Sequence, residues 1–405
     1  MIKYKNYYFG ILILITTIVF CTPILCNSIN NLFVVVFLWI YIIINFNHLT
    51  RHVNARLTFW VITFIIVIFA YRFLGISDAA WGNYLNQLCF YSCILFMPFF
   101  QKELRQSKLL LWMILGLFFF NVVDNIILGY LYPSIHTNLK YVDEDFLATI
   151  NAGGPSFYML VLFTFNICYF VLLNSQRKSL RLLMLISCIL FAIFILGVCF
   201  KGITVLFFLL SVIIIYYAKH TKNISSFISF CVVFLLITFS VVLIFSDEMI
   251  QLVKAVSPNE RLTMRLVTLI DDKDVDANTY TVTGRTDLYL LSIETWLSDV
   301  RNFLIGIGYH IVSYGAAKTG ISQHSDLLDI LACYGLLGLS FIYTIFKRAF
   351  KIIISYFDNE YKLQVSSILM LFVLYGTVEK IFRPMAAVVI FILLPLSAGL
   401  VNKKI

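Results

Sequence analysis

Long apolar runs recur along almost the whole chain, separated mostly by short polar connections. A helix needs about 20 consecutive apolar residues to cross the hydrocarbon core of a bilayer. About twelve runs meet or approach this length. They cover residues 7–26, 29–46, 57–75, 80–100, 108–128, 154–173, 181–198, 201–218, 225–245, 325–346, 363–378 and 382–400. The sequence therefore predicts an all-α, polytopic membrane protein of about 12 transmembrane helices, whose first run is a retained signal anchor.

The composition agrees with a chain whose solvent is lipid. Of its 405 residues, 61% are hydrophobic and only 13% are charged, whereas a soluble domain usually carries about 25% charged residues. The net charge of +9 does not indicate a nucleic-acid partner, because the basic residues form short clusters between apolar runs. The nine cysteines lie in or beside those runs without zinc-ligand spacing, so they predict neither a metal site nor a disulfide framework.

The basic residues also orient the helices. Alternate connections and the two termini carry 18 of the 30 basic residues, while the opposite short connections and adjacent helix ends carry five. The positive-inside rule then places both termini in the cytoplasm and the connections 129–153 and 246–322 outside. The predicted organisation is helices 1–9 within 1–245, a large outer loop over 246–322, and helices 10–12 within 323–405.

Several charged residues are expected at the outer helix ends, where charge beside a membrane helix is costly and often functional. Their side chains could instead extend to the interface and pair with one another. Because they share one side of the membrane, they favour a polar cavity that opens outward. They are Arg72, Asp124, Lys201, Glu379, Lys380 and Arg383.

The outer loop begins with an amphipathic segment, 247–268, that carries Arg261 and Arg265. An acidic turn over 271–276 follows, with Asp-x-Asp pairs of the kind that bind a divalent cation in many nucleotide-sugar glycosyltransferases. We favour a solvated turn and predict no metal, because such enzymes need a soluble nucleotide-binding fold that this chain lacks. A helix is predicted over 288–300 by its apolar spacing, with Thr283 or Thr286 as a candidate N-cap.

Two residues of this loop are candidates for chemistry. His324 directly precedes helix 10 and could act as a general base, since imidazole is readily tuned near neutral pH; a hydrogen-bonded structural role is the alternative. Arg285 could bind a phosphate through two donors, or it could pair with Asp287.

A larger pattern contains both residues. It consists of Gly284-Arg285, Trp296, Leu304-Ile305-Gly306-Ile307-Gly308, His324-Ser325, Leu328-Asp329 and Tyr334-Gly335-Leu336-Leu337-Gly338. The order of these elements resembles the signature of the O-antigen polymerase (Wzy) and O-antigen ligase family over residues 284–338, and the predicted topology extends that resemblance over the whole chain. His-Ser followed by Leu-Asp at helix 10 looks more like the polymerase branch. Lys201 stands where family members commonly carry an arginine, so it keeps the charge but loses the fork geometry.

The resemblance implies a GT-C-like glycosyltransferase in the bacterial plasma (inner) membrane. Such an enzyme polymerises undecaprenyl-pyrophosphate-linked oligosaccharide repeat units into O-antigen or capsular polysaccharide on the outer side. The acceptor hydroxyl attacks the anomeric carbon of the donor, and undecaprenyl pyrophosphate leaves. No cofactor is expected, because the lipid-linked bond already stores the energy. The implied partners are the lipid-linked glycan and the bilayer, with a chain-length regulator and a flippase as candidates.

The resemblance and the chemistry together assign candidate roles. His324 would be the base, and Arg285 is the first candidate to stabilise the leaving diphosphate. Asp326 could orient the His324 imidazole or belong to the helix N-terminus, where a carboxylate is favoured. The other candidate substrate-binding residues are Arg261, Arg265, Lys201, Arg72 and Asp124.

Two other functions stay open. An O-antigen ligase would share the site and transfer the glycan to lipid A core or to protein. A lipid-linked oligosaccharide flippase would fit the helix count, but it has little use for a long outer loop and should place charges near the bilayer midplane.

Overall fold

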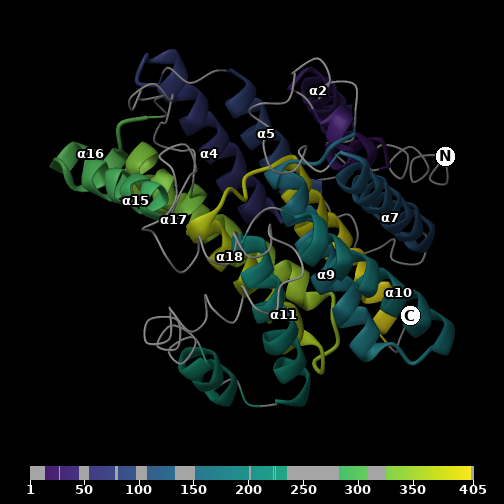
Figure 1. Cartoon of the computed structure of the whole chain (residues 1–405). Helices are drawn as coiled ribbons and strands as arrows, with labels where there is room; N and C mark the ends of the chain where they lie inside the picture. The colour runs from purple at the N-terminus through teal and green to yellow at the C-terminus, as the bar shows by residue number, and fades with distance from the viewer. Residues whose placement is uncertain are drawn as a thin grey trace.

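The computed structural model describes residues 14–26, 28–44, 54–77, 81–96, 107–132, 151–199, 202–221, 223, 225–234, 282–308 and 325–402. These parts of the chain are helical with short connections, and they contain no strand (Figure 1). Seven of the helices are long and apolar enough to span a membrane, so the protein is a multi-pass membrane protein, as predicted. They are α4 (Ala55–Phe73), α7 (Ser107–Leu131), α9 (Pro155–Asn174), α10 (Lys178–Ile193) with η3 (Phe194–Val198), α11 (Gly202–His220), α17 (Asp326–Ser355), and the last helix formed by α19 (Pro384–Ala387), η4 (Val388–Leu393) and α20 (Leu394–Val401).

Shorter helices complete the described structure. Helical residues lie within each of the predicted apolar runs. The shorter apolar helices are α2 (Ser28–Ile44), α5 (Trp81–Phe96), Ser225–Phe234, α18 (Lys362–Val378) and a helix over 14–21, which is followed by the short η1 (Pro23–Leu25). The segment predicted to be the outer loop contributes α15 (Val282–Leu297) and α16 (Val300–Ile305).

Two predicted boundaries are wrong. The helix predicted over 288–300 begins earlier, at Val282, so Thr283 and Thr286 lie inside α15 and do not cap it. The helix predicted to end at residue 346 continues to Ser355. The prediction stopped at a cluster of cations, but Ala349 and Ile353 continue the buried face while Lys351 stays exposed on the other.

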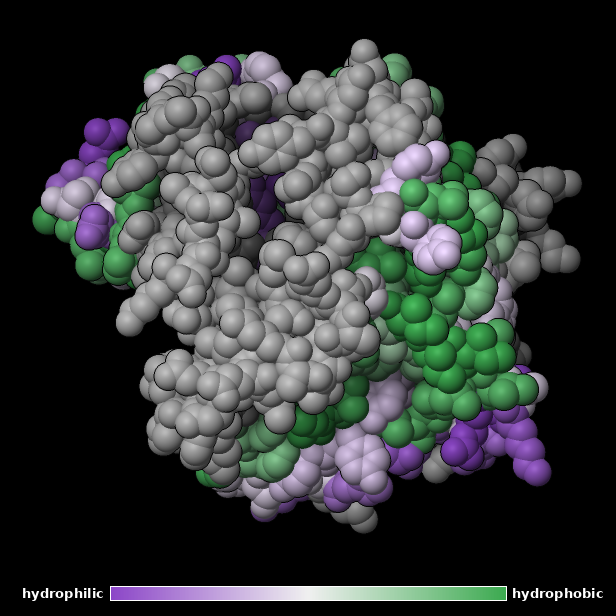
Figure 2. All heavy atoms as spheres, viewed as in Figure 1, coloured by the Kyte–Doolittle hydropathy of each residue, from purple (hydrophilic) through white to green (hydrophobic). Residues whose placement is uncertain are grey.

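The core forms around α9, α18 and the last helix. α9 contacts α10, α11, α18, α19 and α20, and most of its residues and those of the last helix are buried. By contrast, α10 exposes large apolar side chains such as Leu182, Ile186 and Ile189. In the view of Figure 2 the polar side chains gather over α15–α16 and near the α9–α10 connection, and a mainly apolar surface lies over α10. Such an apolar surface is what lipid-facing helices require.

The last helix contains a π-helical stretch, η4, that is explained by its sequence. Pro395 has no N–H to donate, and its ring would clash with the carbonyl of residue 391 in a regular α-helix. The wider turn at Val388–Leu393 precedes this proline. All six residues of the stretch are buried, so the helix stays packed in the core.

A close crossing joins the end of α16 and the residues after it to α17. Gly335 interrupts α17 with φ 58° and ψ −157°, a conformation that only glycine adopts readily. The backbone of Ile307 donates to Ala332 O at 3.0 Å, and that of Gly308 donates to Cys333 O at 2.9 Å. We call this contact, between residues 304–308 and 332–335, the glycine crossing.

Candidate active site

The start of α17 is held by a reciprocal cap. Ser325 Oγ accepts from Leu328 N at 3.2 Å, and Asp329 Oδ2 accepts from Ser325 N at 3.3 Å. Asp329 Oδ1 accepts from Ser292 Oγ of α15 at 2.7 Å. Ser325 and Asp329 are both buried. The cap therefore fixes the point at which the chain enters α17, one residue after His324, and His324 itself lies outside the described residues.

α15 packs along the same helix end. The Tyr289 hydroxyl donates to Val378 O, the last residue of α18, at 2.8 Å. Arg285 belongs to the first turn of α15 and precedes Tyr289 by four residues, which is about one helical turn. The structure thus brings the backbone of α15, the start of α17 and the end of α18 together.

The segment between α18 and α19, residues 379–383, is anchored by Asp326. Asp326 Oδ2 accepts from Ile381 N at 2.5 Å and also from Phe382 N. Asp326 is the first residue of α17, so of its two proposed roles the helix N-terminus is observed, and the carboxylate also binds this segment, which we call the 379–383 hairpin. Because Ile381 and Phe382 are buried, these two N–H groups need an acceptor within the protein.

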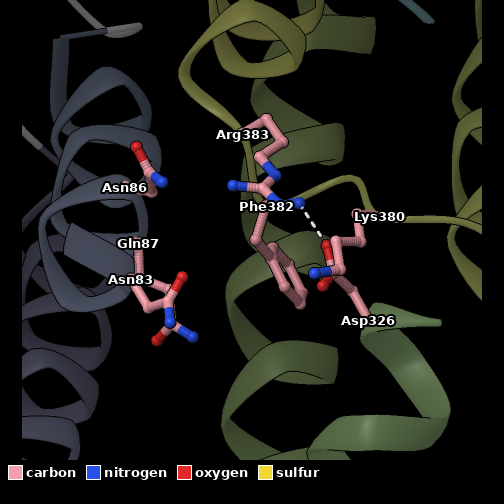
Figure 3. Close-up of a pocket in the computed structure, with 7 residues that line it drawn as sticks. All are labelled: Asn83, Asn86, Gln87, Asp326, Lys380, Phe382 and Arg383. Carbon is pink, nitrogen blue, oxygen red and sulfur yellow. Dashed lines mark hydrogen bonds between the residues drawn. The ribbon is translucent and has the colours of Figure 1, made fainter. Parts of the chain in front are cut away.

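A polar recess lies between the 379–383 hairpin and α5. It is a half-open hollow of about 260 Å³, of which only about 20 Å³ admits the centre of a water molecule, which is room for about one ordered water. Figure 3 shows three amides on α5 at one side and the hairpin side chains at the other. We call it the hairpin recess, and it is lined by Asn83, Asn86, Gln87, Asp326, Lys380, Phe382 and Arg383.

More cations than carboxylates line the hairpin recess. Two cations, Lys380 and Arg383, and one carboxylate, Asp326, line it. Burial is the main cause that lowers the pKa of Lys380 to about 8, and the Arg383 guanidinium is the second. The nearby carboxylates oppose this shift without cancelling it; they are Asp326, Asp329 and Glu379. The site favours an anion, because an anion would relieve the repulsion between the two cations.

Two predicted binding residues lie in other environments. Arg72 Nη1 donates to Ser77 O at 2.9 Å, and its guanidinium lies 5.4 Å from the centre of the Trp81 ring. These contacts fasten the turn between α4 and α5. Arg72 does not line the hairpin recess.

Asp124 belongs to an amide cluster near the end of α7. Asn151 Nδ2 donates to Asp124 Oδ2 at 3.0 Å and to Asn121 Oδ1 at 2.9 Å. Asn125 Oδ1 accepts from Gly153 N at 2.6 Å. This cluster attaches the chain before α9 to α7, and Asp124 does not line the hairpin recess either.

The remaining predicted residues cannot be placed against this geometry. Lys201, Arg261, Arg265 and the acidic turn over 271–276 lie outside the described residues. Of the predicted site residues with described side chains, only Asp326 lines the hairpin recess.

The α5 amides were missed by the sequence analysis. Asn83, Asn86 and Gln87 have the spacing i, i+3 and i+4, which puts them on one face of a helix. A polar face on an apolar helix of near-spanning length is the signal that could have found them. Lys380 and Arg383 were noticed as boundary charges but were not assigned to binding.

Comparisons with known proteins do not assign the chain to a family. No protein-family model matches it, and no curated protein matches it.

Proposed function

We propose that this protein is a membrane glycosyltransferase that polymerises undecaprenyl-pyrophosphate-linked oligosaccharide repeat units into O-antigen or capsular polysaccharide. The site would face the outer side of the plasma membrane, as the positive-inside pattern predicts. The observation that carries the proposal is that α15 packs against the capped start of α17 and the end of α18, and that the start of α17 also holds the 379–383 hairpin, whose two cations line a recess.

The chemistry needs two kinds of group near one another. The leaving group is a diphosphate, so fixed cations should stabilise the charge that develops on it. The attacking sugar hydroxyl benefits from a base. In this proposal Arg285 contributes a cation from the first turn of α15, and His324 is the base beside the Ser325 cap. Arg261, Arg265 and Lys201 are further candidate cations.

The placement of charge favours glycosyl transfer over lipid transport. Asp326, Lys380 and Arg383 lie at helix ends or between helices, whereas a flippase should place charged groups near the middle of its spanning helices. A ligase shares the same proposed chemistry and differs only in its acceptor.

The direct test is polymerisation by purified protein with defined lipid-linked repeat units. We expect the wild type to form a ladder of products, with an arm containing EDTA to test for a required metal. His324→Ala and Arg285→Ala should each lose the ladder, by a factor of about 10²–10⁴ for a general base. His220→Ala and Arg301→Ala are matched controls, because both side chains are exposed. Wild-type product lengths in both site variants would contradict the proposal.

A deletion strain separates the three functions. Single repeat units that accumulate on the outer leaflet indicate a polymerase, and accumulation on the inner leaflet indicates a flippase. Loss of the ladder with one repeat still attached to the core excludes a ligase.

A further inference from the structure

Two cations of the 379–383 hairpin have no partner among the described residues. Neither the Lys380 ammonium nor the Arg383 guanidinium forms a hydrogen bond or an ion pair in that part of the chain. Both are partly buried and line the hairpin recess. A partly buried cation normally gains a counter-charge or hydrogen-bond acceptor to offset its lost hydration.

The one carboxylate in the recess does not serve as that partner. Asp326 Oδ2 accepts from the backbone of Ile381 and Phe382. Its charge attracts Lys380 at longer range, as do the charges of Asp329 and Glu379, which do not line the recess. Asp326 thus holds the hairpin, while Lys380 and Arg383 outnumber it among the lining side chains.

The opposite wall offers neutral hydrogen-bond donors. Asn83 and Gln87 of α5 line the recess, and within the described structure their amides have no hydrogen-bond partner. An amide NH₂ group donates to oxygen without adding charge. Figure 3 shows these amides across the recess from Lys380 and Arg383. This facing arrangement differs from cations that merely extend toward the membrane interface.

We infer that the hairpin recess binds a diphosphate group, with Lys380 and Arg383 on one side and the Asn83 and Gln87 amides on the other. The inference rests on the proposed function, because the donor and its leaving lipid both carry a diphosphate. It adds a binding site whose residues differ from Arg285, Arg261, Arg265 and Lys201. Because the recess is half open and has room for only about one ordered water, the anion binds at its mouth.

Binding can be measured without any polymerisation assay. The full-length protein in detergent is titrated calorimetrically with farnesyl diphosphate, with inorganic pyrophosphate, and with uncharged farnesol. We expect both diphosphates to bind and farnesol not to. Tighter binding of the farnesyl compound identifies a lipid-linked source, and equal binding identifies the free anion as sufficient. Binding of phosphatidylglycerol with no binding of either diphosphate would overturn the inference.

The double variant Lys380→Gln/Arg383→Gln tests the cations. Charge-assisted hydrogen bonds are worth enough that losing each one weakens binding by about tenfold to a hundredfold. The control is Lys351→Gln/Arg56→Gln, which removes two exposed cations elsewhere. Equal affinity in the two double variants would overturn the inference.

A second variant leaves the hairpin untouched. Gln87→Glu keeps the side-chain shape and places a negative charge on the α5 wall, so it should weaken diphosphate binding by at least about tenfold. It keeps the test decisive if the hairpin variant fails to fold; unchanged affinity would count against the site.

The inference and the proposed function can fail separately. If the wild type binds diphosphate through these residues but forms no polymer from defined repeats, the proposed function is wrong and the site stands. If it polymerises, and the Lys380→Gln/Arg383→Gln variant polymerises equally well, the site is wrong and the function stands.

Discussion

The glycine crossing and the hairpin recess both adjoin the first turns of α17. They differ in how closely their atoms pack and in whether their polar groups are hydrogen-bonded. At the crossing, a Cβ on Gly306 would lie 2.3 Å from Cys333 C, and one on Gly335 would lie 2.5 Å from Leu304 C. The backbone there is hydrogen-bonded across the contact. The recess has open space and two cations without partners among the described residues.

This difference separates scaffold from site. Closely packed and satisfied backbone gives a fixed geometry but leaves nothing for a ligand to contact. Unpaired charge in an open recess costs stability and is retained where a ligand supplies the missing partner. The glycine crossing therefore holds α16 against α17, while in our proposal the hairpin recess binds an anion.

The largest expected effect comes from filling the crossing. Gly335→Ala puts a side chain where φ is 58° and ψ is −157°, a region essentially restricted to glycine, which costs about 1–3 kcal/mol by itself, and the overlap with residues 304 and 305 adds to that cost. Gly306→Ala, at φ 72°, likewise combines an unfavourable backbone conformation with an overlap of the added side chain. We expect each variant to lose most of its folded protein, or to lower the midpoint of thermal unfolding in detergent by about 5–10 °C.

Gly116→Ala is the matched control for these variants. It lies inside α7, and no heavy atom lies within 4 Å of the position its Cβ would take. Alanine is the better helix former by about 1 kcal/mol, so the midpoint should stay or rise slightly. A Gly335→Ala midpoint equal to that of Gly116→Ala would show that α16 and α17 do not approach this closely.

The sequence predicts features that depend on neighbouring residues better than features that depend on contacts between distant ones. A run of apolar residues predicts a helix from neighbouring residues alone, and helical residues occur in every predicted run. The glycines of the crossing are visible as Gly306-Ile307-Gly308 and Gly335, and a turn was predicted at the first group. The contact between these two groups of glycines, about 30 residues apart in the chain, is not predicted, because hydropathy does not show which glycines adopt a positive φ.

The geometry of the hairpin recess is even harder to predict from the sequence than that of the glycine crossing. Lys380 and Arg383 stand out in the sequence as charges beside a membrane helix, and Asp326 as a charge at the start of one. That they face Asn83 and Gln87 depends on how helices far apart in sequence pack, which periodicity cannot report.

The next largest effect is expected from releasing the hairpin. Asp326→Ala removes the acceptor for Ile381 N and Phe382 N, and each buried donor left without a partner costs about 1–3 kcal/mol. We expect a lower unfolding midpoint together with weaker diphosphate binding, because the hairpin that carries Lys380 is no longer held. Thermal unfolding and calorimetric titration measure the two effects in one preparation.

Asp326→Asn tests the same contact with a smaller change. It keeps an oxygen acceptor, so its unfolding midpoint and its diphosphate affinity should lie between those of Asp326→Ala and the wild type. Glu294→Ala, which removes an exposed carboxylate from α15, should change neither measurement. If Asp326→Ala behaves like Glu294→Ala, the carboxylate does not anchor the hairpin.

The smallest effect expected is a pH dependence that belongs to the recess alone. Lys380 has a pKa of about 8, so its ammonium is present below that pH and is lost as the pH rises through it. An anion binds the charged form better, and it raises the pKa of Lys380 in the complex. Between pH 7 and pH 9 the affinity for farnesyl diphosphate should therefore fall by up to about tenfold, while Arg383 stays charged throughout.

Lys380→Arg tests whether the titration of Lys380 causes this pH dependence. Its guanidinium keeps the positive charge at both pH values, so binding should persist and become nearly independent of pH over this range. Lys380→Gln should also be independent of pH but bind more weakly. A wild-type affinity that does not change from pH 7 to pH 9, or a Lys380→Arg variant with the full wild-type dependence, would show that the ammonium does not contact the anion. The hairpin recess would then differ from the glycine crossing in how closely it is packed, and not in binding an anion through Lys380.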